Sequence, residues 1–140
     1  MMEGHCLCGA LRYEVHGAPV QLTNCHCSIC RRASGAPFVG WFSVARTQFR
    51  YVMGEPARYP SSSHATRTLC SACGTPITFE STRDPDFLDV TICSLSEPEA
   101  LAPDHHTFTS TQLSWIKLAD GLPRYPRSRS EALTSETSGN

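Results

Sequence analysis

The chain has 140 residues, of which 40% are hydrophobic and 18% are charged, and its formal net charge is -1. This length corresponds to one domain that buries roughly two-thirds of its unfolded surface. The near-neutral charge argues against a strongly basic nucleic-acid-binding protein, and no apolar run approaches the ~18 residues that a membrane helix needs. The first ten residues lack a basic region and an apolar region, so we expect no secretory signal and a cytoplasmic protein.

Short strands separated by turn residues make up most of the predicted structure. Residues 49–53 alternate as a half-buried strand does, and the apolar run 37–44 contains Trp41 and Phe42, which we expect in the core. A segment around Trp115 is expected to close the sheet. Ten prolines and nine glycines suit many tight turns. In chain order, the predicted strands are residues 10–15, 37–44, 49–53, 66–69, 77–80, 87–93 and 113–118.

Two short helices and a tail complete the predicted elements. One helix is expected at residues 28–33, with Ser28 as its cap, and the other at residues 97–101. Residues 126–140 are polar and contain few large apolar side chains. We therefore predict a folded domain of residues 1–125 followed by a flexible tail, which is a simpler interpretation than a partner-binding tail.

Eight cysteines are the most informative feature of the sequence. Disulfide frameworks belong to short secreted chains with more than about 8–10% cysteine, and this chain has less. In a reducing compartment, closely spaced cysteines are typical of metal or redox chemistry. Cys93 stands alone at the end of an apolar strand, and we expect it to be a buried free thiol. The other seven form three groups: Cys6 and Cys8; Cys25, Cys27 and Cys30; and Cys70 and Cys73.

The seven grouped cysteines divide naturally into four and three. Structural zinc takes four protein ligands, whereas catalytic zinc takes three and keeps one position for water or substrate. Cys6 and Cys8 can face one ion because residues two apart in a strand share a side. Cys70 and Cys73 lie in a C-x-x-C-G turn, where the glycine lets the backbone fold around the same ion. Spacing alone also allows the first pair to join the middle group.

Histidine is the other residue type that could complete a metal site. Any one histidine would convert an open three-cysteine site into a closed one. His26 lies between two proposed ligands and would point away from them in an extended segment. For each histidine, a surface position or a supporting role behind the ligands is the simpler expectation. The candidate fourth ligands are His5, His26, His64, His105 and His106.

Three motifs surround the cysteine groups, in chain order GHCLCGALRY, CHCSICRRASGAPF and CSACGTPITF. Together they resemble the glutathione-dependent formaldehyde-activating enzyme family, which also includes centromere protein V. The ending DHHTF, followed by WIKLADGLPRY, is similar to the C-terminal segment of that family. The resemblance covers residues 4 to about 125.

The resemblance implies a mainly β fold, a single zinc-bearing β-tent domain of short antiparallel strands. It also implies two zinc ions, with Cys6, Cys8, Cys70 and Cys73 on a structural zinc and Cys25, Cys27 and Cys30 on the zinc of the active site. The implied activity is carbon–sulfur lyase chemistry that joins glutathione to formaldehyde as S-hydroxymethylglutathione, and the reverse reaction. The expected partners are therefore a small-molecule thiol and an aldehyde, with no nucleic acid and no membrane.

The implied chemistry suits an open zinc site. Zinc lowers the pKa of a thiol that binds it, and three thiolates around one zinc favour delivery of a thiol over polarisation of the aldehyde oxygen. We expect the loop that begins at Gly35 to supply backbone donors. Arg31 and Arg32 are candidates for binding the carboxylates of glutathione, and charge compensation at the thiolates fits them equally well.

Two other classes of protein remain open. A zinc-stabilised binding module without catalysis would hold one zinc, or would use a histidine to complete the second site. A redox enzyme such as a methionine sulfoxide reductase would need a reactive Cys93 and would resist chelators. With seven thiolates and two zinc ions the net charge changes from -1 to -4, which makes nucleic acid a still less suitable partner.

Overall fold

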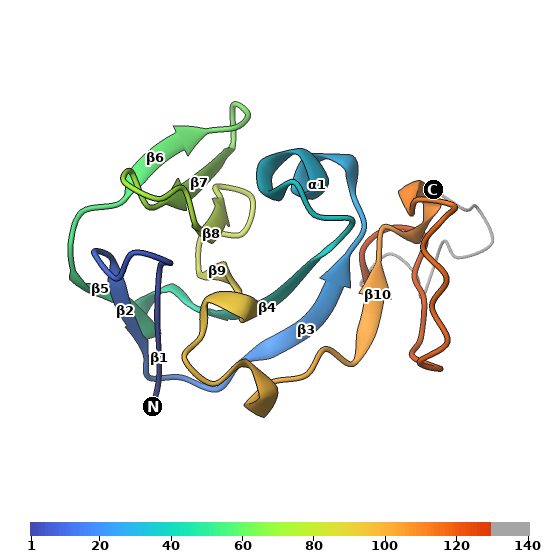
Figure 1. Ribbon diagram of the computed structural model, residues 1–140, viewed down its shortest axis with the longest axis horizontal. Coiled ribbons are helices and arrows are strands. Elements are labelled where there is room, and N and C mark those ends of the chain that lie inside the picture. The colour runs from blue at the N-terminus through green and yellow to red at the C-terminus, as the bar shows by residue number, and fades with distance from the viewer. Residues whose placement is uncertain (130–140) are drawn as a thin grey trace. The chain divides into compact units, whose positions relative to one another are not determined.

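Short strands dominate the computed structural model, which describes residues 1–129 (Figure 1). The fold class is mainly β, as predicted from the sequence. Among the described residues, no helix has the length and apolar character needed to cross a membrane. In chain order the elements are β1 (Met2–His5), β2 (Arg12–Val15), β3 (Val20–Cys25), α1 (Ser28–Ser34), β4 (Val39–Ala45), β5 (Phe49–Met53), β6 (Ala57–Pro60), β7 (Ala65–Leu69), β8 (Pro76–Ser81), β9 (Phe87–Thr91) and β10 (His105–Thr107), with 3-10 turns at Arg46–Gln48, Ile92–Ser94, Pro98–Ala100 and Thr109–Thr111.

The first of two compact units comprises Met1–Gln21 and Phe42–Ala102. It contains a sheet with the order β1-β2-β5, whose pairs are antiparallel. Its other strands follow the order β4-β9-β8-β7-β6, with antiparallel pairing from β9 to β6. Phe42, Val44, Ile77 and Val90 are fully buried and form the centre of its apolar core. The sequence prediction that Phe42 belongs to the core is confirmed.

The buried Tyr13 side chain on β2 requires a glycine, Gly4, at the facing position of β1. The Tyr13 side chain is fully buried, and its hydroxyl lies 2.7 Å from Oγ of Ser94. A Cβ atom at Gly4 would lie 2.3 Å from the Tyr13 ring and 2.5 Å from the carbonyl oxygen of Ser94. Only glycine therefore allows β1 to pack this closely, and this packing fixes the strand that leads into Cys6.

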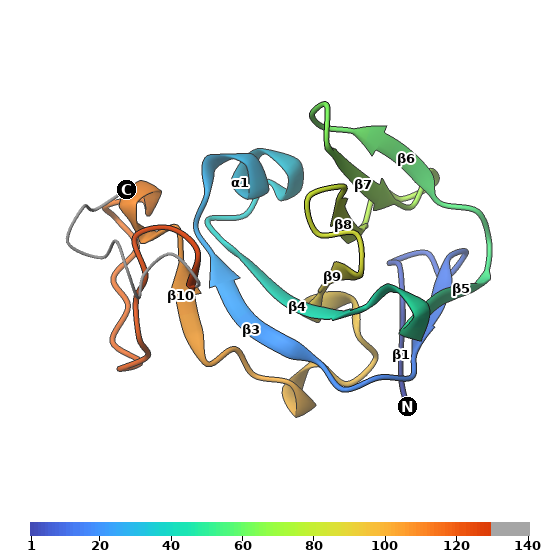
Figure 2. The same ribbon diagram turned by 180° about the vertical axis from the view of Figure 1, so that it is seen from behind.

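Within the described residues, the second unit comprises Leu22–Trp41 and residues 103–129. In this unit β10 lies beside β3 (Figure 2) and pairs with it in parallel. In this pairing His106 lies opposite Asn24 and Thr107 opposite Cys25. The hydroxyls of Thr23 and Thr107 are 2.9 Å apart and tie the two strands together. Two adjacent histidines of β10 are thereby placed beside the strand that ends at Cys25.

Several local predictions differ from the structure. The segment 113–118 is a turn and not a strand, because Ile116 bonds locally to the carbonyl of Leu113 and to the Gln112 side chain, and Trp115 is 66% exposed. Cys93 is exposed, since the chain leaves β9 for a 3-10 turn before reaching it, so its prediction as a buried thiol was wrong. The helix predicted at residues 97–101 is a single 3-10 turn.

The predicted tail begins within the described residues. The carbonyls of Pro126 and Arg127 accept hydrogen bonds from the amides of Ser110 and Phe108. Residues 130–140 of the predicted tail lie outside the described residues. The division at residue 125 stays a prediction.

Asp89 on β9 is a half-buried carboxylate in the first unit. The Ser43 hydroxyl donates a hydrogen bond of 2.5 Å to its Oδ1. Burial raises the pKa of Asp89 from 3.8 to about 6, against the opposing effect of the Ser43 hydrogen bond. The folded protein therefore binds a proton at Asp89 more tightly than the unfolded chain does.

Asp89→Asn tests the stability cost of this charge. Because the folded pKa is raised, the contribution of the protonated carboxyl is fully present below pH 4 and is lost as the pH rises through about 6. We expect the variant to be more stable than wild type by about 2 kcal/mol at pH 8 and equally stable at pH 3.5. Urea unfolding at the two pH values measures the difference.

Asp86→Asn is the control, because Asp86 is an exposed aspartate three residues before Asp89. It should change the free energy of unfolding by less than about 0.5 kcal/mol at either pH. A constant difference between wild type and Asp89→Asn across this pH range would contradict the assignment.

Candidate metal centres

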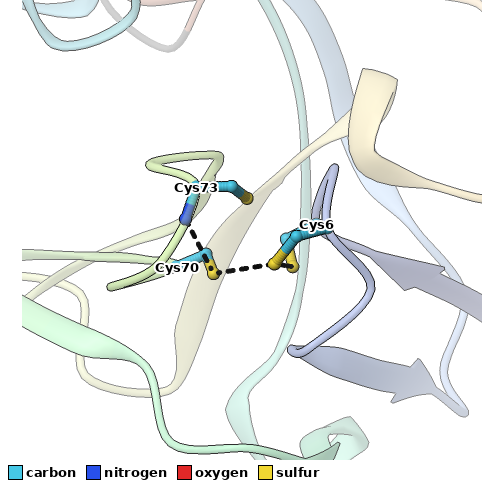
Figure 3. A group of neighbouring side chains, drawn as sticks. Cys6, Cys70 and Cys73 are labelled. Atoms are coloured by element: carbon cyan, nitrogen blue, oxygen red, sulfur yellow. Dashed lines mark hydrogen bonds between the residues drawn. The ribbon is translucent and has the colours of Figure 1, made fainter.

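The sulfur atoms of Cys6, Cys8, Cys70 and Cys73, the four-cysteine group, come together in the first unit. Figure 3 shows Cys6, Cys70 and Cys73 of this group. All four Sγ atoms lie within 4.8 Å of one another, with 3.6 Å between Cys6 and Cys8 and 3.8 Å between Cys8 and Cys70. Sulfur atoms at the corners of a zinc tetrahedron lie about 3.8 Å apart, given a Zn–S distance of about 2.3 Å. The two pairs thus form one cluster that could hold a metal ion.

Backbone amides surround the sulfur atoms of the four-cysteine group. The amide of Leu11 donates to Sγ of Cys6 at 3.3 Å, and the amide of Cys73 donates to Sγ of Cys70 at 3.4 Å. The chain can bend in this way because Gly9 and Gly74, which follow the pairs, adopt the left-handed conformation that favours glycine. Hydrogen bonds from the side chain and the backbone of Thr75 lower the pKa of Cys73 to about 5. Cys73 therefore favours the thiolate, the form that binds metal.

Cys25, Cys27 and Cys30, the three-cysteine group, lie in the second unit where β3 turns into α1. Cys25 is the last residue of β3, Cys27 precedes the helix and Cys30 lies in its first turn. Their Sγ atoms also lie within 4.8 Å of one another. Cys25 and Cys30 are buried and Cys27 is half-buried, so the group is largely shielded from water.

Cys27 caps helix α1. Its Sγ accepts a hydrogen bond of 3.2 Å from the amide of Cys30. The sequence prediction that Ser28 caps this helix was therefore wrong. A cap residue accepts from an amide two or three residues later, and the spacing Cys27–Cys30 brings the two sulfur atoms together in the same way. The cap and the sulfur cluster are therefore one local structure.

The three thiols share protons unequally. Hydrogen bonds from the side chains of Cys25 and Cys30, followed by the amides of Cys30 and Ile29, hold the pKa of Cys27 far below its ordinary value. The same contacts raise the pKa of Cys25, chiefly its hydrogen bond to Cys27. The first thiolate of the group therefore forms at Cys27, at the end of the helix where amide groups favour negative charge.

None of the five candidate histidines joins the three-cysteine group within residues 1–129. His5 bonds to the carbonyl of Cys6, and His64 bonds to Ser62. His26 is fully buried, and its Nε2 lies 3.0 Å from Nδ1 of His106. Burial, followed by the nearby His106, lowers the pKa of His26 to about 4, so this ring is neutral.

A hydrogen-bonded chain of His26, His106 and Asp120 was missed by the sequence reasoning. Nε2 of His106 lies 2.8 Å from Oδ2 of Asp120. The three residues are far apart in the sequence, and the short strand β10 that carries His106 gives no periodic signal. The one sequence signal for these hydrogen bonds was the motif DHHTF. The motif is similar to the C-terminal segment of a known family, but that likeness assigns no role to its histidines.

The predicted substrate residues take different positions. Arg31 donates to the carbonyls of His26 and Thr111 at 2.9 and 2.5 Å, which ties the helix to the chain around it. Arg32 is exposed on the last turn of α1. Gly35 is the left-handed residue that ends the helix, and its amide donates to the carbonyl of Arg31 at 2.7 Å. The Gly35 amide is thus already hydrogen-bonded within the helix end. It is therefore not the free backbone donor for a ligand that the sequence analysis expected.

Comparisons with known proteins agree with the sequence motifs. The sequence model of the glutathione-dependent formaldehyde-activating enzyme family matches residues 1–111. An uncharacterised lyase of Schizosaccharomyces pombe is 34% identical over 89 residues, which are 62% of this chain and 64% of that protein. The chain thus spans less than two thirds of that relative.

A second relative and a solved structure extend the likeness over more of the chain. A putative glutathione-dependent formaldehyde-activating enzyme of Halomonas elongata is 23% identical over 130 residues, covering 84% of this chain and 81% of that protein. A crystal structure of a Rhodobacter sphaeroides protein matches with a TM-score of 0.58 and 22% identity, covering 88% of this chain and 99% of that one. This match shows a similar fold.

Cys8→Ser tests the four-cysteine group. Loss of one of four ligands should release one metal ion per chain and lower the Tm by about 10 °C, because metal binding contributes directly to folding. Elemental analysis and thermal unfolding measure the two effects. Cys93→Ser is the matched control, since Cys93 is exposed and outside both groups, and it should change neither quantity. Full metal content in Cys8→Ser would exclude this group as a metal site.

Proposed function

This chain belongs to the glutathione-dependent formaldehyde-activating enzyme family, and we propose on that premise that it is a lyase-type enzyme that adds a thiol to a small aldehyde. The three-cysteine group carries the proposal. It gathers three thiols, and no fourth ligand atom from residues 1–129 joins them. Three protein ligands are the pattern of catalytic zinc, whereas four are the pattern of structural zinc. The names of the two relatives, a lyase and a putative formaldehyde-activating enzyme, support the same reaction class.

Zinc is the metal that we assign to both groups. Donor sets made only of cysteine sulfur favour zinc or iron–sulfur clusters and disfavour magnesium and calcium, and the sulfur separations in the four-cysteine group match a zinc tetrahedron. The four-cysteine group would hold the structural ion and the three-cysteine group the ion of the active site. When bound at the three-cysteine group, zinc would lower the pKa of a substrate thiol that coordinates it.

The residues of the three-cysteine group prepare the site for an anionic sulfur. The amides at the start of α1 point at Sγ of Cys27 and stabilise negative charge there. Cys25 and Cys30 are buried, so that charge is held in a medium from which water is largely excluded. These features favour a ligand set that is already ionised when substrate arrives.

The proposed reaction needs no oxidant or reductant. The substrate thiol gives up its proton, and its sulfur forms a bond to the aldehyde carbon. The electron pair of the C=O double bond moves to the oxygen, which takes a proton and becomes the hydroxyl of the adduct. In reverse, the carbon–sulfur bond breaks and the aldehyde is released, which is the direction that a lyase name describes.

Glutathione and formaldehyde are the substrates that we propose. Glutathione carries two carboxylates, and arginine binds carboxylates through paired hydrogen bonds. Arg32 is exposed on the last turn of α1, the helix that also carries Cys30, whereas Arg31 is occupied by two backbone carbonyls. We therefore assign substrate binding to Arg32 and a structural role to Arg31.

Cys27→Ser tests the catalytic group. The serine hydroxyl can still cap α1, but it is a poor zinc ligand, so we expect thiol–aldehyde adduct formation to fall by at least about 100-fold while the protein stays folded. Adduct formation is followed by NMR with glutathione and formaldehyde, and folding by circular dichroism. Wild-type activity in the folded variant would overturn the proposal. One metal per chain in the wild type, without response to thiols, would instead indicate a binding module.

Arg32→Ala tests the choice of thiol. Removing a carboxylate contact of this kind should raise the KM for glutathione about tenfold, with little change in kcat. Cysteamine, a thiol without carboxylates, is the matched control substrate and should show no change in KM. An equal effect on both thiols would show that Arg32 does not recognise a carboxylate.

A further inference from the structure

His26 joins the three-cysteine group to a carboxylate at the protein surface. Its Nε2 lies 3.0 Å from Nδ1 of His106, whose Nε2 lies 2.8 Å from Oδ2 of Asp120. Both imidazoles are fully buried, and the Asp120 side chain is 40% exposed. These hydrogen bonds thus connect His26, which lies between two proposed metal ligands, to the carboxylate of Asp120, which is in contact with water.

The position of each proton in this chain follows from the carboxylate. An ionised carboxylate only accepts hydrogen bonds, so Nε2 of His106 carries a proton and donates it to Asp120. A neutral His106 then accepts at Nδ1, and the donor is the Nε2 proton of His26. Nδ1 of His26 is left without a proton, and it is buried without a hydrogen-bond partner among the described residues. The ring of His26 is therefore held in place from one side.

The backbone of His26 is fixed as tightly as its ring. Its amide donates to the carbonyl of Thr107 at 3.0 Å. Its carbonyl accepts from Arg31 at 2.9 Å and from the hydroxyl of Thr111 at 3.0 Å. Phe38 packs against the ring, with 4.9 Å between the ring centres. A rotation of His26 would therefore break several contacts, and it would also move the cysteines on both sides.

We propose that His106 and Asp120 are positioning residues that hold His26 and thereby fix Cys25 and Cys27 in the geometry that binds metal. The inference rests on the proposed function, which assigns a metal ion to the three-cysteine group. Loss of the carboxylate leaves His106 free to change its tautomer, and the buried Nε2 proton of His26 then loses a fixed acceptor. The segment between β3 and α1 relaxes, and the three sulfur atoms no longer converge.

A second aspartate–histidine pair one residue away provides a matched control. Asp104 bonds to Nδ1 of His105 at 2.5 Å, and His105 is also buried in β10. Successive residues of a strand point to opposite faces, so His105 points away from the face on which His106 meets His26. Substitution at Asp104 removes the same kind of bond without touching the chain to the cysteines.

The test compares zinc affinities in Asp120→Ala and Asp104→Ala. Release of zinc to a chromophoric chelator gives the affinity of each site, and Cys27→Ser identifies the zinc held by the three-cysteine group. We expect Asp120→Ala to weaken that zinc about tenfold and to leave the four-cysteine group unchanged. Asp104→Ala should change neither site. Asp120→Asn keeps a hydrogen-bonding group beside His106 and should restore the affinity to within about threefold of wild type.

The outcomes separate this inference from the proposed function. Equal zinc affinities in Asp120→Ala and Asp104→Ala overturn the positioning role, as does an equal loss from both cysteine groups. A single zinc in the wild type overturns the proposed function and this inference together. Two zincs and a weakened second site, without adduct formation from glutathione and formaldehyde, leave the positioning role standing and remove the proposed reaction.

Nitrogen-15 NMR of the zinc-loaded wild type keeps the inference testable if Asp120→Ala does not fold. We expect His26 and His106 to carry their protons at Nε2. A proton at Nδ1 of His26, or at both nitrogens of His106, would show that the hydrogen bonds between His26, His106 and Asp120 do not have the donors and acceptors described above. The ring-nitrogen signals of His105 serve as the internal comparison.

Discussion

The convergence of cysteine sulfur atoms is the constraint on which the rest of the structure depends. In the first unit, pairs from distant parts of the sequence meet, and in the second unit three cysteines meet at one strand-to-helix turn. Sulfur atoms this close repel one another when ionised, as the opposite pKa shifts of Cys25 and Cys27 illustrate. A bound cation removes that repulsion and turns a strained cluster into a cross-link. The short strands around it need not supply all of the stability that a small β protein requires.

The two groups differ in how the backbone presents their sulfur atoms. The four-cysteine group is built from two turns, each with a left-handed glycine, and each turn aims amides at its own sulfur. The three-cysteine group uses a helix cap instead, and a buried histidine separates two of its members. Turns that enclose an ion on all sides suit a structural role. A group at a helix end, with fewer sulfur atoms and additional hydrogen-bond support, suits chemistry.

Local sequence patterns predicted much of the fold and the close cysteine pairs, since both depend on short-range spacing. The alternation at residues 49–53 and the C-x-x-C spacing are examples, and β5 and the turn that carries Cys70 and Cys73 follow them. Spacing alone did not decide that Cys6 and Cys8 join Cys70 and Cys73, because residues 62 positions apart meet there. The role of His26 could not be predicted, because it depends on the parallel pairing of β10 with β3, which joins residues about 80 positions apart. Trp115 misled the prediction, since an aromatic side chain in a locally bonded turn gives the same signal as one in a strand.

The use of Cys27 as a helix cap also determines the order in which this part of the chain can fold. Helix α1 has seven residues, fewer than the roughly 12 to 15 that an isolated helix needs to persist in water. Its first turn is closed by a sulfur atom that the metal would also bind, so neither the helix nor the ligand set is complete without the other. Nascent chains would therefore acquire this helix and their metal in one cooperative event, and the supply of metal would govern the yield of mature protein.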